Sequence, residues 1–380
     1  MIVNQVIPVN NGRFYCLKYN CKRLTKSFKI CFLLLLIYLV LLLITEKISL
    51  TAITSPALPT TTSMVTTKKI KKPNKYVSSN LAASSRLGNH LFELSALLAI
   101  ARKLERIPTF FIIDHHYDQM LKDTDFVIPG LLDHFLIINE SVPVSITPTD
   151  FQLKCCMWDD PDRLKNITDE YIHIRGTHYQ SWKFFPRLRN ELMGYLKTTK
   201  NKFPNLPKSS SNTFVTCVHI RRTDFVGSGF HVPDEKFILS AMQFVEQKEK
   251  RRKQINMSTV FFGDDHAFME GISNQSFTLS NGRVKDLKLE SFVSYDDPAD
   301  SMIYSKNNCD VVLFTAPHTT FGWWLGYLSK GNQVYYTDIK YVDDNSIASG
   351  LFDPDDYYPP HWTPFKYNEF DNTTVVETMK

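Results

Sequence analysis

Residues 214–224 read FVTCVHIRRTD, and this stretch decides the fold. Its first seven residues are apolar or β-branched apart from one histidine, a pattern typical of a strand buried on both faces of a parallel sheet. The polar residues that follow stand at the carboxyl end of that strand. Ligands bind at this end of the strands in open α/β sheets. The stretch therefore predicts a parallel α/β sheet with a binding site at residues 219–224.

The alternation of strand, turn and helix recurs along the rest of the chain. Short apolar strands are predicted over residues 109–113, 259–263, 311–315 and 333–337. Helices are predicted over residues 89–107, from Pro233 onward and over 320–328. About 300 residues of this alternation, with the polar run KSSSN near its middle, fit two Rossmann-like lobes with a cleft between them. The lobes are predicted to divide near residues 205–213.

The composition is that of a globular protein. Of the 380 residues, 43% are hydrophobic and only 22% are charged, which provides a sizeable core and excludes general disorder. The net charge of +5 lies at the amino terminus, because residues 1–29 hold six Lys and Arg and no Asp or Glu. The remaining chain therefore carries a net charge of −1. A nucleic-acid-binding protein would carry basic excess in its folded part, so we expect no nucleic-acid partner.

The uncharged segment ICFLLLLIYLVLLLI at residues 30–44 predicts a membrane segment. A basic region of 29 residues precedes it and no clear cleavage site follows it, which favours a signal anchor over residues 30–45 rather than a cleaved signal peptide or a buried core helix. The expected order is a cytosolic tail (1–29), the anchor, a flexible Thr- and Pro-rich stem (46–75) and a lumenal domain (76–380). The short span favours a Golgi membrane over the thicker plasma membrane.

Four cysteines follow the anchor: Cys155, Cys156, Cys217 and Cys309. They permit two disulfides in any of three pairings. Sequons for N-glycosylation, about as many as composition alone would give, occur at Asn139, Asn166, Asn256, Asn274 and Asn372. Both features are compatible with a lumenal domain.

Two adjacent arginines, Arg221 and Arg222, follow the strand of residues 214–220. A guanidinium stays charged at every relevant pH and bonds phosphate oxygens bidentately, so the pair suits a diphosphate. Asp224 is placed to orient an arginine, and His219 to contact a base or a sugar. A surface arginine pair beside a core histidine is the alternative.

Two further segments place polar groups at predicted helix starts, where backbone amides can bind an anion. In SRLGNHLF, residues 85–92, Gly88 permits a tight turn and Asn89 stands at the helix start, where it would otherwise be a plain N-cap. In TTFGWW, residues 319–324, two threonine hydroxyls precede a helix whose tryptophans are expected in the core. Asp264 and Asp265 follow the predicted strand 259–263, where a capping role is expected.

Together the motifs HIRRTD, RLGNHLF and TTFGWW resemble the fingerprints of the Golgi α-1,2-fucosyltransferase family, in the family's order. The resemblance covers residues 76–341 and implies two Rossmann-like lobes of GT-B type. The chain departs from the family pattern at Ser85, where glycine is usual, at His90 in place of glutamine and at Thr319 in place of serine. The run VHIRRTDFVGSGFH is also similar to the α-1,6 branch of the superfamily, so GDP-fucose is implied more firmly than the linkage.

The resemblance also implies roles for individual residues. Arg221 would clamp the diphosphate, and Arg86 and Asn89 would face the donor sugar-phosphate, which makes these three the candidate catalytic residues. The other donor-binding residues would be His219, Arg222, Asp224, Asp300, Thr319 and Thr320. Of these, His219 and Asp300 would contact the guanosine, and the threonines would bind phosphate.

The expected reaction is inverting transfer of L-fucose from GDP-fucose to a hydroxyl of an acceptor glycan, α-1,2 to galactose. Arginine can hold the charge of the departing GDP without a metal, so we expect no cofactor. The metal-dependent alternative requires a D-x-D at a strand end; the sequence matches the letters at 123–125, 160–162 and 353–355, each predicted to be a turn. Asp114-His115-His116 lacks a spaced further ligand.

Three different functions also fit these motifs. The chain could be an α-1,6-fucosyltransferase, a protein O-fucosyltransferase, or a pseudoenzyme that binds nucleotide sugar or glycan without catalysis. A general base is expected for transfer, and the sequence does not distinguish it among its acidic residues and histidines.

Overall fold

The computed structural model describes residues 74–253, 256–274, 290–371 and 373–378. The described residues belong to one compact unit. The predicted cytosolic tail, the anchor and nearly all of the stem lie outside them, so these predictions are untested. Of the described helices, none is long and apolar enough to cross a membrane.

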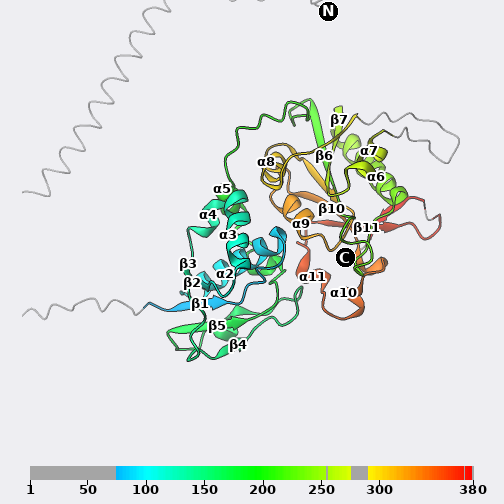
Figure 1. Ribbon diagram of the computed structural model, residues 1–380. Helices are drawn as coiled ribbons and strands as arrows, with labels where there is room; N and C mark the ends of the chain where they lie inside the picture. Colours follow the sequence, from blue (N-terminus) through cyan, green and yellow to red (C-terminus); the bar gives the residue numbers. More distant parts are fainter. Residues whose placement is uncertain (1–73, 254–255, 275–289, 372, 379–380) are drawn as a thin grey trace, which may run out of the picture. The chain divides into compact units, whose positions relative to one another are not determined.

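The first sheet has five parallel strands in the order β3-β2-β1-β5-β4 (Figure 1). They are β1 (Tyr76–Ser79), β2 (Ile107–Phe111), β3 (Leu136–Ile138), β4 (Pro148–Asp150) and β5 (Tyr171–Arg175). Strands β1 and β5 are neighbours and run the same way, so the turns that follow them emerge at the same edge of the sheet.

The second sheet has seven strands in the order β12-β11-β10-β9-β6-β7-β8, and only the edge strand β12 is antiparallel. The strands are β6 (Thr213–Ile220), β7 (Asn256–Gly263), β8 (Glu290–Val293), β9 (Val311–Phe314), β10 (Gln333–Thr337), β11 (Thr363–Tyr367) and β12 (Val375–Glu377). The deciding strand β6 lies inside the sheet between β9 and β7, and it is buried along residues 214–220. The prediction of parallel α/β sheets is confirmed.

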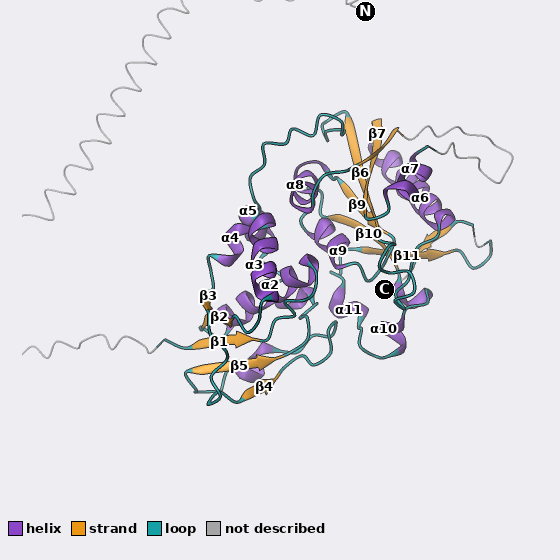
Figure 2. Ribbon diagram, viewed as in Figure 1, coloured by secondary structure: helices purple, strands orange, loops and turns teal. Residues whose placement is uncertain are grey.

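Helices and short 3-10 turns connect the strands (Figure 2). Those of the first half are α2 (Leu87–Lys103), α3 (His116–Val127), α4 (Pro129–Leu132), η1 (Pro161–Leu164), η2 (Trp182–Phe184) and α5 (Arg189–Tyr195). Those of the second half are α6 (Glu235–Lys253), α7 (His266–Ser273), α8 (Pro298–Asn308), α9 (Thr320–Tyr327), η3 (Ile339–Tyr341), α10 (Asn345–Ala348) and α11 (Pro354–Tyr357).

Helices α2 and α9 lie close together (Figure 1), and an aromatic cluster between them joins the two halves. Trp323 and Trp324 of α9 are buried, and their rings lie 4.5 and 5.1 Å from that of Phe92 on α2. The indole Nε1 of Trp324 donates a hydrogen bond to the carbonyl of Gly88, 3.0 Å away. The prediction that the tryptophans are core residues is confirmed, and their packing holds the starts of α2 and α9 together.

The four cysteines pair as Cys155–Cys156 and Cys217–Cys309. The second bridge joins the middle of β6 to Cys309, which ends α8 two residues before the neighbouring strand β9, whereas the first joins adjacent residues. Sequence separation alone does not distinguish this pairing from the other two.

Two elements have bounds that differ from the predicted ones. Strand β2 begins two residues earlier than expected, because Ile107 and Pro108 already pair with β1. Helix α2 begins at Leu87 rather than Asn89, with Arg86 as its N-cap, and ends at Lys103. The prediction that residues 123–125 form a turn is wrong, because they lie inside α3, whose apolar side is buried.

Candidate functional site

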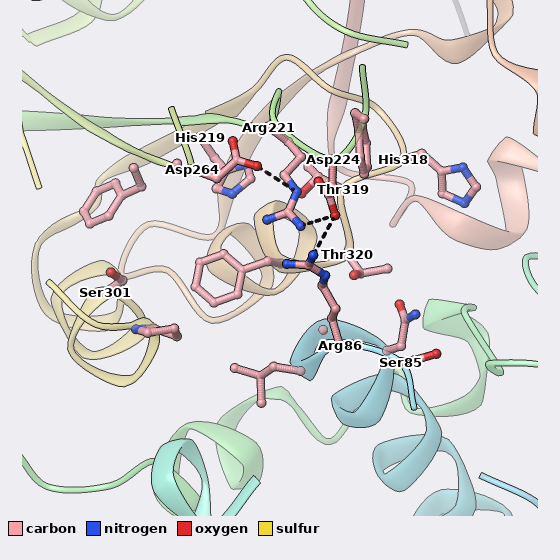
Figure 3. Close-up of a pocket in the computed structure, with 18 of the residues that line it drawn as sticks. Ser85, Arg86, His219, Arg221, Asp224, Asp264, Ser301, His318, Thr319 and Thr320 are labelled. Atoms are coloured by element: carbon pink, nitrogen blue, oxygen red, sulfur yellow. Dashed lines mark hydrogen bonds and ion pairs between the residues drawn. The ribbon is translucent and has the colours of Figure 1, made fainter. Parts of the chain in front are cut away.

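A cavity of about 770 Å³ opens between the first turn of α2 and the carboxyl ends of β6 and β7 (Figure 3). Seven of the nine residues predicted to bind the donor line it. They are Arg86, Asn89, His219, Arg221, Asp224, Thr319 and Thr320. The fold thus brings together three motifs that are far apart in the sequence.

The guanidinium groups of Arg86 and Arg221 meet at one carboxylate (Figure 3). Asp224 Oδ2 lies 2.7 Å from the Nη2 of Arg221 and 3.3 Å from the Nη2 of Arg86. The Arg221 side chain is 17% exposed and that of Arg86 is 72% exposed. The shared carboxylate oxygen therefore stands where two cations from different elements converge, as an oxygen of a bound phosphate would.

Asp264 is a site residue for which the sequence predicted only a capping role. It follows β7 directly and its Oδ2 lies 3.2 Å from the Nε of Arg221. It also accepts hydrogen bonds from the Thr223 hydroxyl and the Arg222 amide. Although burial by itself would raise the pKa of Asp264, these bonds and the Arg221 charge bring it below its ordinary value. Asp264 thus holds Arg221 from the side opposite Asp224.

The signal that could have identified Asp264 is its position. It stands after a buried strand in the same way that Arg221 does, and β6 and β7 are parallel neighbours. Polar residues at the carboxyl ends of adjacent parallel strands meet at one edge of the sheet. Asp265 is a cap, as predicted, since its carboxylate accepts from the amide of Phe268 at 3.1 Å.

His219 lies at the end of β6 and is 1% exposed. Burial, with the nearby charge of Arg221, lowers the pKa of His219 to about 3, so its ring is neutral at physiological pH. Its Nδ1 is buried without a hydrogen-bond partner among the described residues. The α9 backbone approaches this ring closely, because a Cβ on Gly322 would lie 2.8 Å from Nδ1.

Two helices begin at the cavity. Arg86 caps α2 without a side-chain hydrogen bond, and Thr319 caps α9 by accepting from the amide of Gly322 at 3.3 Å. Asn89 is not the N-cap but lies in the first turn, where its Oδ1 accepts from Gln180 Nε2 at 2.9 Å. The positive ends of both helix dipoles therefore face the cavity that Arg221 lines, which favours an anionic ligand.

Arg222 does not line the cavity. Its Nη1 donates to the carbonyl of Pro233 at 2.8 Å, its Nε lies 3.3 Å from Asp265 Oδ2 and its guanidinium lies 3.8 Å from the ring centroid of Phe268. The predicted donor contact of Arg222 has no support in this arrangement. The residue instead fixes the loop that carries Arg221.

Asp300 is also outside the cavity lining. It lies in the first turn of α8, where its Oδ2 accepts from Asn201 Nδ2 at 2.9 Å. Asp296 does line the cavity, and it accepts from the same Asn201 amide at 2.9 Å. The turn before α8 directs the Asp296 carboxylate into the cavity. Residue spacing along the sequence did not predict this turn.

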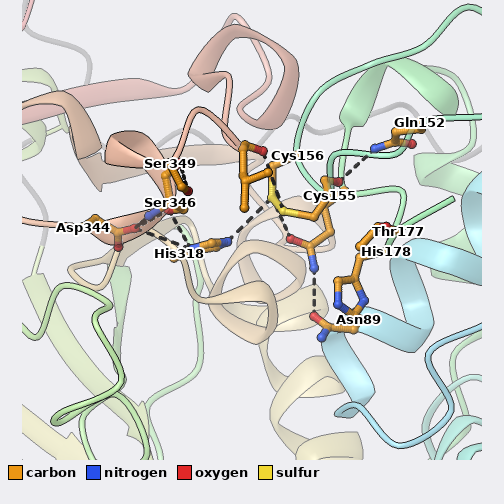
Figure 4. Close-up of a disulfide and its surroundings, with 12 residues drawn as sticks. Asn89, Gln152, Cys155, Cys156, Thr177, His178, His318, Asp344, Ser346 and Ser349 are labelled. Carbon is orange, nitrogen blue, oxygen red and sulfur yellow. Dashed lines mark hydrogen bonds and ion pairs between the residues drawn. A yellow bond between two sulfur atoms is a disulfide. The ribbon is translucent and has the colours of Figure 1, made fainter.

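The cavity wall on the side of the first sheet contains Asn89, Cys155 and His178 (Figure 4). Gln180 also lines this wall. Cys155 belongs to the vicinal disulfide, whose other sulfur, on Cys156, lies 3.6 Å from His318 Nε2. No local pattern in the sequence marks His178, Gln180 or His318 as a site residue. Only the fold brings them to the cavity that Asn89 lines.

The acidic motifs considered for a metal have other partners. Asp160 caps η1 and Asp353 caps α11, and Asp162 pairs with Lys103 and Lys165. Asp123 lines the cavity and accepts from Gln119 Nε2 at 2.7 Å. Among the described residues, two groups bring three potential ligand atoms within 4.8 Å: Cys155, Cys156 and His318, and the exposed Asp114, His115 and His116. The first group contains the disulfide.

The model of glycosyl transferase family 11 matches residues 50–366, which include every element that lines the cavity. The chain belongs to glycosyl transferase family 11. The protein is therefore a glycosyltransferase, and the family resemblance expected from the three motifs is confirmed.

Relatives agree with this assignment. The chain is 46% identical to the Caenorhabditis elegans protein named "Putative galactoside 2-alpha-L-fucosyltransferase svh-11", over 82% of this chain and 84% of that one. It is 31% identical to a galactoside 2-alpha-L-fucosyltransferase of the same organism, over 74% and 75% of the two chains. It is 23% identical to the galactoside alpha-(1,2)-fucosyltransferase 2 of Sus scrofa, over 78% and 83%. This glycosyltransferase is thus similar to fucosyltransferases along most of its length.

Proposed function

We propose that this glycosyltransferase moves L-fucose from GDP-fucose to the 2-hydroxyl of a galactose in an acceptor glycan, with inversion and without a metal. The convergence of Arg221, Arg86 and two helix starts on one cavity carries the proposal. The printed names of the relatives support the acceptor and the linkage.

The donor would bind with its diphosphate at the carboxyl end of β6. Its oxygens would replace Asp224 as the partner of the two guanidiniums, while Asp264 keeps Arg221 in place from the other side. The guanosine would extend toward His219 and Asp296, which line the same cavity on the side of the second sheet. Thr319 and Thr320 would meet the phosphates at the start of α9.

Negative charge grows on the β-phosphate as the bond from fucose to GDP breaks. Asp264 holds Arg221 before the donor arrives and would keep holding it while the phosphate displaces Asp224. The guanidinium would therefore stay in place through the reaction, and such preorganisation is what stabilises a transition state. The arginines and helix dipoles would supply the positive charge that a metal provides in other transferases. The acceptor hydroxyl would attack from the opposite face of the sugar, which gives inversion.

We further propose that the protein is a single-pass type II membrane protein of the Golgi with its catalytic domain in the lumen. The basic residues before residue 30 and the apolar segment after them support this topology. The described sequons, at Asn139, Asn166, Asn256 and Asn274, are exposed, as glycosylation requires, and Asn372 lies outside the described residues.

The test incubates the purified full-length chain with GDP-fucose and an array of glycans, followed by linkage analysis of each fucosylated product. We expect fucose on terminal β-galactosides and its release by an α-1,2-specific fucosidase. Transfer only to an N-glycan core or to a serine or threonine would replace this proposal with α-1,6- or protein O-fucosyltransferase activity. GDP binding without any transfer would indicate a pseudoenzyme.

A further inference from the structure

The turn after β5 holds a histidine on the cavity wall. His178 and the next residue, Tyr179, both have left-handed backbone conformations, with φ of +56° and +49°. Such conformations are costly for residues other than glycine and persist only where the surroundings enforce them. Here the buried Tyr179 hydroxyl bonds Ser79 Oγ at 2.6 Å, at the end of the neighbouring strand β1. The turn therefore fixes the place of His178.

A buried carboxylate faces one edge of the His178 ring. Glu93 of α2 is 1% exposed, and its two oxygens accept from the amide of Ala82 at 3.1 and 3.0 Å. Its Oε1 also lies 3.4 Å from Nδ1 of His178, a long contact that leaves Nδ1 without a hydrogen bond among the described residues. Catalytic hydrogen bonds are often long in the free enzyme and tighten when substrate binds.

The other edge of the ring is open to the cavity. Nδ1 is buried, while the side chain as a whole is 26% exposed and lines the cavity, so the accessible part of the ring carries Nε2. An Nδ1 proton directed at Glu93 leaves Nε2 as a free base. A histidine oriented by a carboxylate is a common arrangement for removing a proton from a hydroxyl.

The dyad lies beside the predicted position of the donor sugar. Glu93 is four residues after Asn89 and therefore on the same face of α2. Gln180, two residues after His178, donates to Asn89 Oδ1 at 2.9 Å (Figure 4). With the guanosine on the side of the second sheet, the acceptor must enter along the wall of the first sheet, where His178 lies.

We propose that His178 is the general base of the transfer and that Glu93 is its positioning residue; this inference rests on the proposed function. Nε2 takes the proton of the attacking acceptor hydroxyl as its oxygen forms the new bond to the anomeric carbon of fucose. The bond from that carbon to the β-phosphate oxygen breaks, and its electron pair leaves with GDP. Glu93 stabilises the imidazolium, which releases its proton to water after the product departs.

Two other side chains on the cavity wall are rivals for this role. Both ring nitrogens of His318 have partners, because Nε2 lies 3.6 Å from Cys156 Sγ and Nδ1 lies 3.1 Å from Ser346 Oγ. Asp123 accepts from the amide of Gln119 and has no second group to orient it among the described residues. His318 therefore has no free ring nitrogen, and Asp123 has no described group that would orient it as Glu93 orients His178.

A pH profile of the reaction must take account of the other titratable groups around the cavity. Besides Glu93, these are Arg86 at the start of α2, Asp123 on α3, Arg221 and Asp224 after β6, Asp264 after β7, His266 at the start of α7, Tyr295 and Asp296 before α8, and His219 and His318. His219 is neutral throughout the range in which an ordinary histidine titrates.

The test compares His178→Asn with wild type in the full-length chain, because asparagine tolerates a left-handed backbone but cannot take the proton. We expect kcat for transfer to fall by about 10²–10⁴-fold, with the dissociation constant of GDP, measured by calorimetry, unchanged within about twofold. The fall of kcat at acidic pH, which reports the base in the wild type, should disappear in the variant.

Further variants separate a chemical role from a structural one. Glycine also accepts the left-handed backbone, so His178→Gly should regain activity with added imidazole, and Glu93→Gln should lower kcat and shift the acidic limb of the pH profile. His318→Asn and Asp123→Asn should each retain at least about a tenth of the wild-type kcat. A His178→Asn enzyme that transfers fucose within about tenfold of wild type overturns the inference, as does a greater loss in either rival variant. Failure of the proposed function can be told apart from failure of this inference, because the wild-type enzyme itself would then transfer no fucose.

Discussion

Arg221 is the side chain on which the proposed chemistry depends most. Asp224 and Asp264 hold its guanidinium from two sides, so its fork is aimed before the donor binds. Arg221→Lys keeps the charge but loses the bidentate geometry, and we expect turnover to fall by on the order of 10²-fold or more. Arg221→Ala should abolish detectable transfer and weaken GDP binding in calorimetry.

Arg222 provides the matched control for Arg221. It lies next to Arg221 in sequence but bonds the Pro233 carbonyl outside the cavity. Arg222→Ala should therefore harm GDP binding less and lower the thermal midpoint more than Arg221→Ala does. The reverse order in calorimetry and in thermal unfolding would show that the two arginines have exchanged roles.

His219 should make the stability of the folded protein depend on pH. Its pKa is about 3 in the folded state against an ordinary value of 6.5, so between these values the unfolded state binds the proton and the folded state does not. Stability from this residue is full above about pH 6.5 and is lost as the pH falls toward 3; at pH 5 the loss is about 2 kcal/mol. Denaturant unfolding of wild type and His219→Gln at pH 7 and pH 5 checks this, and equal losses in the two proteins would contradict it.

At the scale of elements, the starts of α2 and α9 cross closely at Gly88. A Cβ at this position would lie 2.8 Å from the backbone nitrogen of Phe321 and closer still to the Thr320 hydroxyl. Gly88→Ala should push apart the two helix ends that face the cavity, and thereby reduce both transfer activity and the thermal midpoint. Both quantities are measured on the same purified protein.

Gly194 is the control for this substitution, since it lies inside α5 and a Cβ added to it would have no described atom within 4 Å. Gly194→Ala should raise stability by about 0.5–1 kcal/mol, because alanine loses less backbone entropy in a helix. A Gly88→Ala protein that gains stability in the same way would show that the two helices can separate freely.

At the scale of the whole molecule, the apolar segment predicts the topology of the chain. The basic residues before residue 30 should remain cytosolic, so protease added to sealed microsomes should spare everything beyond about residue 45. Detergent should abolish this protection. Digestion of the C-terminal part in intact vesicles would place it on the cytosolic side.

The balance of charge in the cavity predicts transfer without a metal. Two arginines and two helix starts face the cavity where the diphosphate is proposed to bind, and Asp123 is the single member of the D-x-D matches that lines it. Activity should therefore be equal, within about twofold, in excess EDTA and with added manganese. Loss of activity with the chelator and its recovery with manganese would refute this assignment.

The sequence alone determined the parallel α/β architecture and the family. Strand β6 could be predicted because a run of apolar and β-branched residues is a local signal, and Arg221 and Asp224 followed from their place at its end. The motifs around Arg86 and Thr319 were equally local, because a helix start depends on neighbouring residues. These properties need no knowledge of which segments meet.

The tertiary structure decided everything that depends on contacts between distant segments. Asp264 became a partner of Arg221 because β7 pairs with β6, and Asp296 rather than Asp300 faces the cavity because of the turn before α8. His178 and Glu93 are 85 residues apart and meet only because β5 pairs with β1, which precedes α2. Strand pairing and helix packing set these distances, and residue order along the chain does not encode them in any local pattern.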